Sequence, residues 1–178
     1  MNKILMVAAA LMLSACGGDT GVMREIERAE QEAAQSAQQT AASNEEFLEQ
    51  VSSLDGVEQR ASGLLLEFRN RGADQSLPRP SADAAVLVHY EGRLANGEVF
   101  DSSFARGEPA EFPLGAVVAG FSEAIQQMRP GDEVIATFPG DLGYGPEGRG
   151  PIPPNAALQF RIALLAFQEP GGAPVTAP

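Results

Sequence analysis

The amino-acid sequence predicts an α+β fold in which one short helix packs against an antiparallel β-sheet. Apolar and polar residues alternate along residues 86–94 and 158–167, which is the pattern of strands with one buried face. Asn96-Gly97 lies between two apolar segments, and because both residues tolerate positive φ angles, the pair indicates a hairpin turn. Residues 121–128 have apolar side chains at helical spacing and predict the helix.

The N-terminal residues predict a targeting segment that is not part of the fold. Lys3 precedes an apolar run at residues 4–13, which is too short to span a bilayer and is typical of a signal peptide. Residues 13–16 read Leu-Ser-Ala-Cys and resemble the lipobox of bacterial lipoproteins, in which the cysteine becomes the lipid-modified first residue. We therefore expect a signal peptide at 1–15, a lipid anchor at Cys16, a tether at 16–21 and a location in the cell envelope, at the outer membrane. The alternative is a plain secretory signal with an unmodified cysteine.

Residues 22–56 predict a helical, acidic arm. No proline or glycine occurs between residues 22 and 50, where Ala, Glu, Gln and Arg dominate. The apolar positions are mostly alanines, which bury little area. Ser43 and Glu46 have the spacing of a capping box, which predicts that a second helix begins there and ends at Gly56. Two interpretations remain open: a solvated spacer, or an arm through which the chain forms a homodimer.

The remaining elements follow from composition and turn signals. Residues 63–69 and 133–138 are rich in apolar residues and predict strands, whereas residues 71–85 are polar, contain prolines and predict a loop. After Glu169 the sequence has no pattern, so residues 168–178 are predicted to form a disordered tail.

Composition and charge exclude several classes of function. The 178 residues carry a net charge of −12, and an acidic surface repels the phosphates of nucleic acids. The only cysteine, Cys16, rules out an intrachain disulfide and a cysteine-rich metal site. The only histidine, His89, leaves too little for a zinc centre or a Ser-His-Asp triad, and we expect it on the sheet face opposite to Tyr90. No metal site, nucleophile motif or phosphate-binding loop is predicted.

Aromatic residues at the ends of the predicted elements are the remaining candidates for a site. They are Tyr90, Phe100, Phe112, Phe121, Tyr144 and Phe160. Core packing and the lining of a pocket are both compatible with their positions. The carboxylates are mostly of the surface type, except Asp101, which follows Phe100 at the end of a strand.

Residues 63–167 resemble the FKBP-type peptidyl-prolyl cis-trans isomerases. The matching segments are VHYEGRLANGEVFDSS at 88–103, RGEPAEFPLG at 106–115, VVAGFSEAIQQMRPGDE at 117–133 and LGYG…IPPNAALQFRIALL at 142–165. The lipobox and the arm make the chain similar to the branch that includes the macrophage infectivity potentiators and periplasmic isomerases, whose members often dimerise through N-terminal helices. The resemblance implies a twisted antiparallel sheet wrapped around one short α-helix, preceded by the helical arm, with an apolar pocket between sheet and helix.

The resemblance also implies roles for ten residues of that pocket. The catalytic residues would be Tyr90, Asp101 and Tyr144, with the Tyr144 hydroxyl directed at a substrate carbonyl and Asp101 orienting the pocket without proton transfer. The substrate-binding residues would be Phe100, Phe112, Val117, Val118, Phe121, Ile152 and Phe160. Phe121 stands where the family normally has tryptophan, so we expect activity with an altered ligand preference.

The implied function is peptidyl-prolyl cis-trans isomerisation that assists the folding of cell-envelope proteins. The pocket would desolvate and twist X-Pro imide bonds without covalent chemistry, and no cofactor is implied because bond rotation consumes nothing. The implied partners are proline-containing polypeptides, macrolide inhibitors and the membrane through Cys16, but no nucleic acid. Two alternatives remain open: a membrane-tethered chaperone that binds peptides in the same pocket without catalysis, and a structural lipoprotein.

Overall fold

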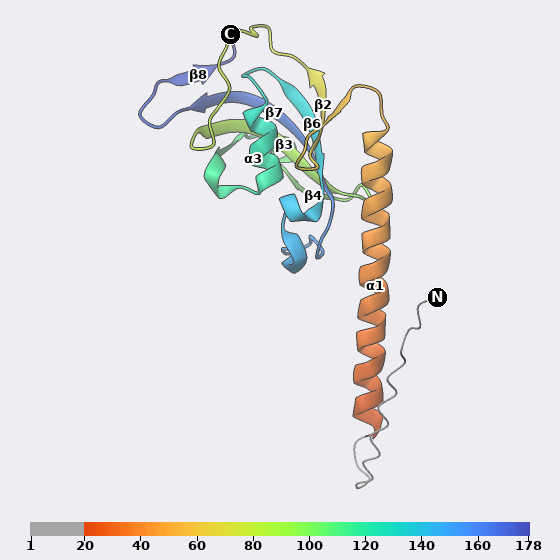
Figure 1. Ribbon diagram of the computed structural model, residues 1–178. Helices are drawn as coiled ribbons and strands as arrows, with labels where there is room; N and C mark the ends of the chain where they lie inside the picture. Colours follow the sequence, from red (N-terminus) through yellow and green to blue (C-terminus); the bar gives the residue numbers. More distant parts are fainter. Residues whose placement is uncertain (1–19) are drawn as a thin grey trace, which may run out of the picture. The chain divides into compact units, whose positions relative to one another are not determined.

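The computed structural model describes residues 20–178 (Figure 1). The predicted signal peptide at 1–15 and Cys16 lie outside the described residues, as does most of the tether at 16–21, whose last two residues belong to the first helix. The chain divides into two units, Met1–Ser36 and Ala37–Pro178. The second unit contains the end of that helix and the whole sheet.

The first helix, α1, runs without a break from Thr20 to Ser52. The second helix predicted at the capping box of Ser43 and Glu46 is therefore wrong, and so is the predicted end at Gly56. Good helix formers flank Ser43 on both sides, so backbone hydrogen bonding continues past a serine that could otherwise cap a helix.

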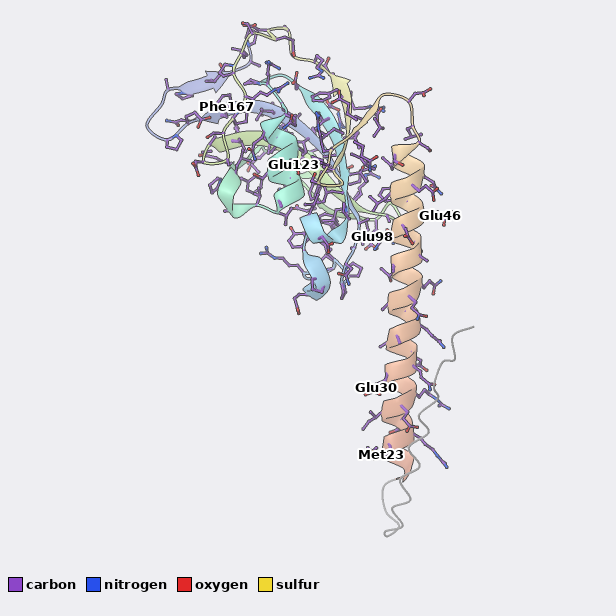
Figure 2. The ribbon with its side chains drawn as sticks, viewed as in Figure 1. Met23, Glu30, Glu46, Glu98, Glu123 and Phe167 are labelled. Atoms are coloured by element: carbon purple, nitrogen blue, oxygen red, sulfur yellow. The ribbon has the colours of Figure 1, made fainter. Side chains whose placement is uncertain are left out.

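The first unit presents apolar side chains to solvent. Val22, Met23 and Ile26 are 53%, 56% and 47% exposed, and Figure 2 shows Met23 near the start of α1. Nowhere in residues 20–178 is there a helix that is both long and apolar enough to cross a membrane.

Eight strands form one antiparallel sheet in the second unit. Their spatial order is β1-β2-β6-β7-β3-β4, with β5 paired to β3 and β8 paired to β7. The strands are β1 Val57–Gln59, β2 Leu65–Asn70, β3 Ala85–Leu94, β4 Val99–Ser102, β5 Ala110–Pro113, β6 Glu133–Phe138, β7 Leu158–Gln168 and β8 Pro174–Thr176. The helical segments between them are α2 Ser103–Arg106, α3 Ala119–Gln126 and the 3-10 turns η1 Leu114–Ala116, η2 Gly140–Leu142 and η3 Gly145–Glu147.

The strands predicted from alternation are confirmed. The structure has β3, β6 and β7 where residues 86–94, 133–138 and 158–167 predict them, and β2 overlaps the strand predicted at 63–69. In β3 every second residue is buried, from Val86 to Leu94. The predicted hairpin is also confirmed, because the Leu94 amide donates to the Glu98 carbonyl at 2.9 Å and Gly97 has a φ of +84°.

The predicted helix corresponds to α3, which contacts β6 and β7 (Figure 1). Its residues Phe121, Ala124 and Ile125 are buried, and Met128 is buried just beyond its end. Together with the inward faces of β2, β3, β6 and β7 they form the hydrophobic core. Burial of each large apolar side chain contributes about 1.5–3 kcal/mol.

The prediction of a disordered tail is wrong. Residues Pro174–Thr176 form β8, which pairs antiparallel with the end of β7. A turn with Gly171 at a φ of +71° reverses the chain, and the amide of Ala177 donates to the carbonyl of Leu165. Main-chain hydrogen bonds to an available edge of β7 do not depend on the type of side chain, so the sequence pattern gives no signal for this strand.

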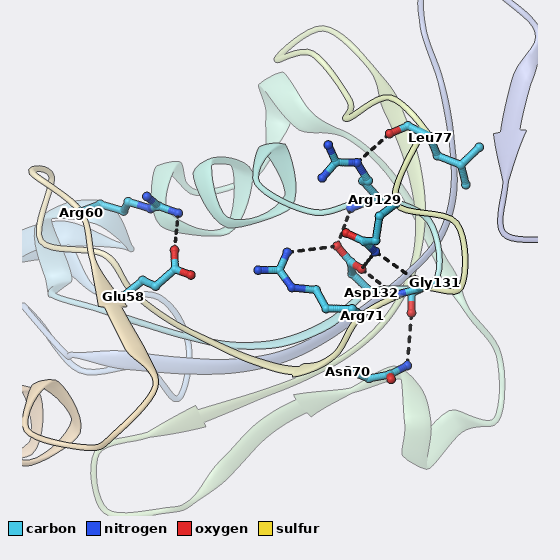
Figure 3. Close-up of polar contacts among 10 residues, drawn as sticks. Glu58, Arg60, Asn70, Arg71, Leu77, Arg129, Gly131 and Asp132 are labelled. Atoms are coloured by element: carbon cyan, nitrogen blue, oxygen red, sulfur yellow. Dashed lines mark hydrogen bonds and ion pairs between the residues drawn. The ribbon is translucent and has the colours of Figure 1, made fainter.

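Asp132 is the clear exception to the expectation that most carboxylates lie on the surface, because it is only 1% exposed. Figure 3 shows polar contacts around it. Its Oδ1 accepts hydrogen bonds from the Gly72 amide at 2.7 Å and from Gln75 Nε2 at 3.1 Å, and its Oδ2 accepts one from the Arg129 amide at 2.9 Å. The Arg71 guanidinium lies 3.9 Å from Oδ2. One buried carboxylate therefore ties the loop after β2 to the turn between α3 and β6.

Candidate active site

The ten residues predicted for the pocket line one cavity of about 500 Å³. They are Tyr90, Phe100, Asp101, Phe112, Val117, Val118, Phe121, Tyr144, Ile152 and Phe160. Sequence reasoning missed four further lining residues, which are Ala116, Arg149, Gly150 and Pro151.

The cavity lies where the central strands, α3 and the segment before β7 converge. Tyr90 comes from β3, Phe160 from β7 and Phe121 from the first turn of α3. On β3, Gly92 is the register partner of both Phe160 on β7 and Asp101 on β4. The middle of the wall therefore carries a residue without a side chain, and the space is occupied by neighbouring rings.

Aromatic rings in edge-to-face contact form the floor and walls. The ring centroid of Phe160 lies 5.2 Å from that of Phe121 and 5.5 Å from that of Phe100, and the centroid of Tyr90 lies 5.6 Å from that of Phe112. Phe121 and Phe160 are each 4% exposed. This floor is apolar and holds its shape through ring contacts that add about 0.5–1.5 kcal/mol per pair.

Three polar side chains form a hydrogen-bonded group at one wall. The Tyr90 hydroxyl donates to Asp101 Oδ2, and Arg106 donates through Nη1 to Asp101 Oδ1 and through Nη2 to the Tyr90 hydroxyl at 3.1 Å. The one-turn helix α2 places Arg106 there; Ser102 accepts from the Ala105 amide at its start, and Gly107, with a φ of +74°, ends it. The negative charge of Asp101 is therefore compensated within the group.

The segment between β6 and β7 contributes five lining residues, which are Tyr144, Arg149, Gly150, Pro151 and Ile152. Tyr144 precedes η3, and within residues 20–178 its hydroxyl has no hydrogen-bond partner. Arg149 and Ile152 form an isolated antiparallel bridge, with reciprocal amide-to-carbonyl hydrogen bonds of 2.9 Å. A Cβ atom on Gly148 would lie 2.4 Å from the Ile152 carbonyl oxygen, and its φ is +64°, so this position requires glycine.

Comparisons with known proteins identify the family to which this chain belongs. Residues 78–165 match the family model described as FKBP-type peptidyl-prolyl cis-trans isomerase. The FKBP-type 22 kDa peptidyl-prolyl cis-trans isomerase of Escherichia coli is 42% identical over 145 residues, which cover 80% of this chain and 69% of that protein. The chain belongs to the FKBP-type peptidyl-prolyl cis-trans isomerase family.

Two further FKBP-type proteins support the predicted branch and fold. The peptidyl-prolyl cis-trans isomerase Mip of Coxiella burnetii is 42% identical over 124 residues, which cover 69% of this chain and 53% of that protein. The crystal structure of FkpA from Escherichia coli has a TM-score of 0.70 and 29% identity, with coverage of 85% of this chain and 74% of that chain. The predicted α+β fold is confirmed. The chain spans about half the length of several curated relatives that it matches.

The polar group of this FKBP-type pocket shifts the pKa values of its members. Burial raises the pKa of Tyr90, and the hydrogen bond to Asp101 raises it further. Burial raises the pKa of Asp101, but the hydrogen bonds from Tyr90 and Arg106 outweigh it, so the net pKa lies below the ordinary value. Asp101 is therefore charged and Tyr90 is neutral across the neutral pH range.

These pKa shifts predict that the stabilising contribution of Asp101 is lost at acidic pH. A lowered pKa in the folded state means that Asp101 stabilises the fold above its unfolded pKa of about 3.9, and that this contribution is lost as the pH falls through the folded value. The raised pKa of Tyr90 gives the opposite sign, a loss only as the pH rises above about 10. We expect the difference in melting temperature between the wild type and Asp101→Asn to be constant from pH 5 to pH 9 and to shrink below pH 4. An equal difference at pH 3 and pH 7 would contradict this assignment.

Gly92 gives a second prediction. A Cβ atom there would lie 2.4 Å from Cζ of Phe100 and 2.8 Å from Cε1 of Phe160, so both rings must move in Gly92→Ala. We expect a loss of about 1–3 kcal/mol in the free energy of unfolding, measured with urea, and displaced ring resonances in NMR spectra. The control is Gly115→Ala, where the added Cβ has no neighbour closer than 3.9 Å and the loss should be below about 0.5 kcal/mol. Unchanged ring resonances in Gly92→Ala would show that the space is not needed.

Two arginines are the functional candidates that sequence reasoning missed. Arg106 is the last residue of the helix α2, five residues after Asp101, and only the cap at Ser102 and the Gly107 position could have signalled that the chain turns back there. Arg149 lies in a glycine- and proline-rich segment whose bridge is formed by backbone atoms. His89, as predicted, is on the other face, where its ring stacks on Phe104 at 4.9 Å.

The described part of the chain contains no cluster of three or more His, Cys, Asp or Glu side chains that could hold a metal ion. What the cavity offers is an aromatic surface, two tyrosine hydroxyls, one compensated carboxylate and the side chain of Arg149.

Proposed function

We propose that this chain catalyses the cis-trans isomerisation of X-Pro bonds in polypeptides. The observation that carries the proposal is the combination of a cavity of about 500 Å³, lined by six aromatic side chains of which three are buried, with membership of the FKBP-type family. A cavity of this size admits a proline ring and its flanking residues.

The reaction is a rotation, and the cavity acts on its barrier. Amide resonance gives the imide bond a barrier of roughly 18–20 kcal/mol, and exchange of an X-Pro bond takes tens to hundreds of seconds in water. The planar imide is the more dipolar state and is the better solvated one. An aromatic cavity removes that hydration and so favours the twisted transition state, with a tenfold gain in rate for each ~1.4 kcal/mol.

The polar residues hold the substrate and the cavity in place. The Tyr144 hydroxyl, which has no partner elsewhere in residues 20–178, donates a hydrogen bond to a substrate carbonyl. Tyr90, Asp101 and Arg106 fix one another and so keep the wall between Phe100 and Phe112 rigid. None of these groups transfers a proton or forms a bond to the substrate.

The test is direct measurement of exchange. NMR exchange spectroscopy on a capped Ala-Phe-Pro-Phe peptide, with the purified chain added at low concentration, is expected to show cis-to-trans conversion well above the uncatalysed rate. A rate equal to the uncatalysed one would refute the proposal. Suppressed aggregation of an unfolded client without faster proline-limited refolding would instead show a non-catalytic chaperone.

Substitution of Tyr144 is the most specific single-residue test of the proposed hydrogen bond to the substrate. Tyr144→Phe removes one hydroxyl and keeps the ring, so we expect kcat/KM to fall about fivefold, the value of one hydrogen bond, with an unchanged urea midpoint. The comparison is Tyr90→Phe, which also removes the hydrogen bond that Asp101 Oδ2 accepts and should lower both kcat/KM and the urea midpoint. Wild-type kcat/KM in Tyr144→Phe would remove Tyr144 from the mechanism.

The location is the second part of the proposal. The apolar run at 4–13 and the sequence Leu-Ser-Ala-Cys support export and lipid attachment at Cys16, which would place the isomerase at the outer membrane to assist folding of envelope proteins. Incorporation of labelled palmitate into the wild type, and its loss in Cys16→Ser, is the expected result. Equal labelling of both would contradict lipid attachment at this residue.

The arm supports the homodimer rather than the spacer interpretation. Val22, Met23 and Ile26 repeat at helical spacing and are about half exposed, which a solvated spacer does not require. Sedimentation of the chain with and without residues 17–56 is expected to show a dimer and a monomer, respectively. A monomer in both cases would identify the arm as a spacer.

A further inference from the structure

Two charged residues line the cavity, and only one of them is compensated. Asp101 is paired with Arg106, whereas Arg149 forms no ion pair with any residue in the described part of the chain. Six other arginines form ion pairs, and they are Arg60, Arg69, Arg71, Arg93, Arg106 and Arg161. The free charge of the cavity is therefore positive.

The backbone at Arg149 is held in place by hydrogen bonds within its own segment. The two hydrogen bonds between Arg149 and Ile152 close a tight turn, in which Gly150 has a φ of +55°. Gly148 packs on the Ile152 carbonyl on the other side. The Arg149 guanidinium carbon lies 5.8 Å from the ring centroid of Tyr144, so the cation lies over the ring of the residue proposed to hold the substrate.

The sign of this charge opposes that of the whole chain. With a net charge of −12 the general field attracts basic peptides and repels acidic ones. At the short range of a bound peptide, a cation that lines the cavity dominates over distant charges, which salt screens within about 8–10 Å. Glu147, two residues away and exposed, forms no ion pair with Arg149 in residues 20–178 and leaves the cation available.

We propose that Arg149 is a specificity-determining residue that makes this site prefer X-Pro substrates with a carboxylate side chain next to the proline. The inference rests on the proposed isomerase function and names its substrate class. An exposed carboxylate–guanidinium pair changes an equilibrium about two- to fivefold, so the preference is moderate and depends on salt.

The experiment compares matched peptides in the NMR exchange assay. Capped peptides of the form Ala-Xaa-Pro-Phe and Ala-Ala-Pro-Xaa carry Glu, Gln or Lys at Xaa, so that the side chain supplies the only charge. For the wild type at low salt we expect kcat/KM to be about fivefold higher for Glu than for Lys in at least one series, with Gln between them. In 0.5 M salt the ratio should approach one.

Two variants assign the preference to Arg149. Arg149→Gln is expected to bring the Glu-to-Lys ratio to one or below, because the acidic field of the chain then acts alone. Arg79→Gln is the matched control: Arg79 is exposed and outside the cavity lining, so the same change in net charge should leave the ratio near five.

The outcomes separate this inference from the proposed function. Catalysis of all six peptides without preference, or a preference that survives in Arg149→Gln, overturns the role of Arg149 and leaves the isomerase function intact. Absence of catalysis with every peptide refutes the proposed function, and the inference with it.

Discussion

Replacing Phe160 with alanine is expected to lower the free energy of unfolding by about 3–5 kcal/mol and to reduce isomerase activity below detection. Phe160 is 4% exposed, and its ring contacts Phe121, Phe100 and Phe138 at centroid distances of 5.2, 5.5 and 5.7 Å. The truncation leaves a void under three rings and lets water reach the imide. The loss of stability is measured by urea unfolding, and activity is measured at a temperature at which the variant remains folded.

Phe47→Ala is the matched control for Phe160→Ala. Phe47 lies on α1, is only partly buried and does not line the cavity, so its removal should cost about 1 kcal/mol and leave catalysis unchanged. Wild-type catalysis in a folded Phe160→Ala protein would show that the aromatic floor does not lower the barrier.

Replacing Asp132 with alanine is expected to lower the free energy of unfolding by about 3 kcal/mol. The substitution leaves the buried amide of Gly72 and the amide of Arg129 without an acceptor, and each unsatisfied donor costs about 1–3 kcal/mol. The variant no longer has a carboxylate to bury, and the saved desolvation cost offsets part of this loss. The loss is measured as a lower urea midpoint, and faster amide exchange of Gly72 shows that the loop after β2 is released.

Two further substitutions at carboxylates test the origin of that loss. Asp132→Asn keeps one acceptor and places an amide donor against the second backbone N–H, so it should remain about 2 kcal/mol less stable than the wild type. Asp55→Ala changes an exposed carboxylate and should shift the free energy by less than about 0.5 kcal/mol. Equal midpoints for Asp132→Ala and Asp55→Ala would mean that the buried hydrogen bonds contribute nothing.

The fold was predictable where its cause is local. The alternation in β3 and β7 and the helical spacing around Phe121 each put one face of an element toward the core, and the hairpin at Gly97 depends on a conformation that glycine allows. The resemblance to a family then placed ten residues of the pocket, and all ten line one cavity.

Other features could not be predicted because their partners are distant in the sequence. The sequence around Asp132 does not distinguish it from an exposed aspartate. The residue is buried only because the loop after β2 folds over it. The strand β8 forms because β7 offers it main-chain groups, and the continuous helix through Ser43 shows that a short capping motif does not stop a helix with good helix formers on both sides.

The sequence alone determined the strands β2, β3, β6 and β7, the helix α3 and the family, because periodicity and motif spacing are properties of neighbouring residues. The tertiary structure decided which charges meet at the cavity. It compensates Asp101 through Arg106 and leaves Arg149 free beside Tyr144, since these distances depend on how α2 and the segment before β7 return to the sheet.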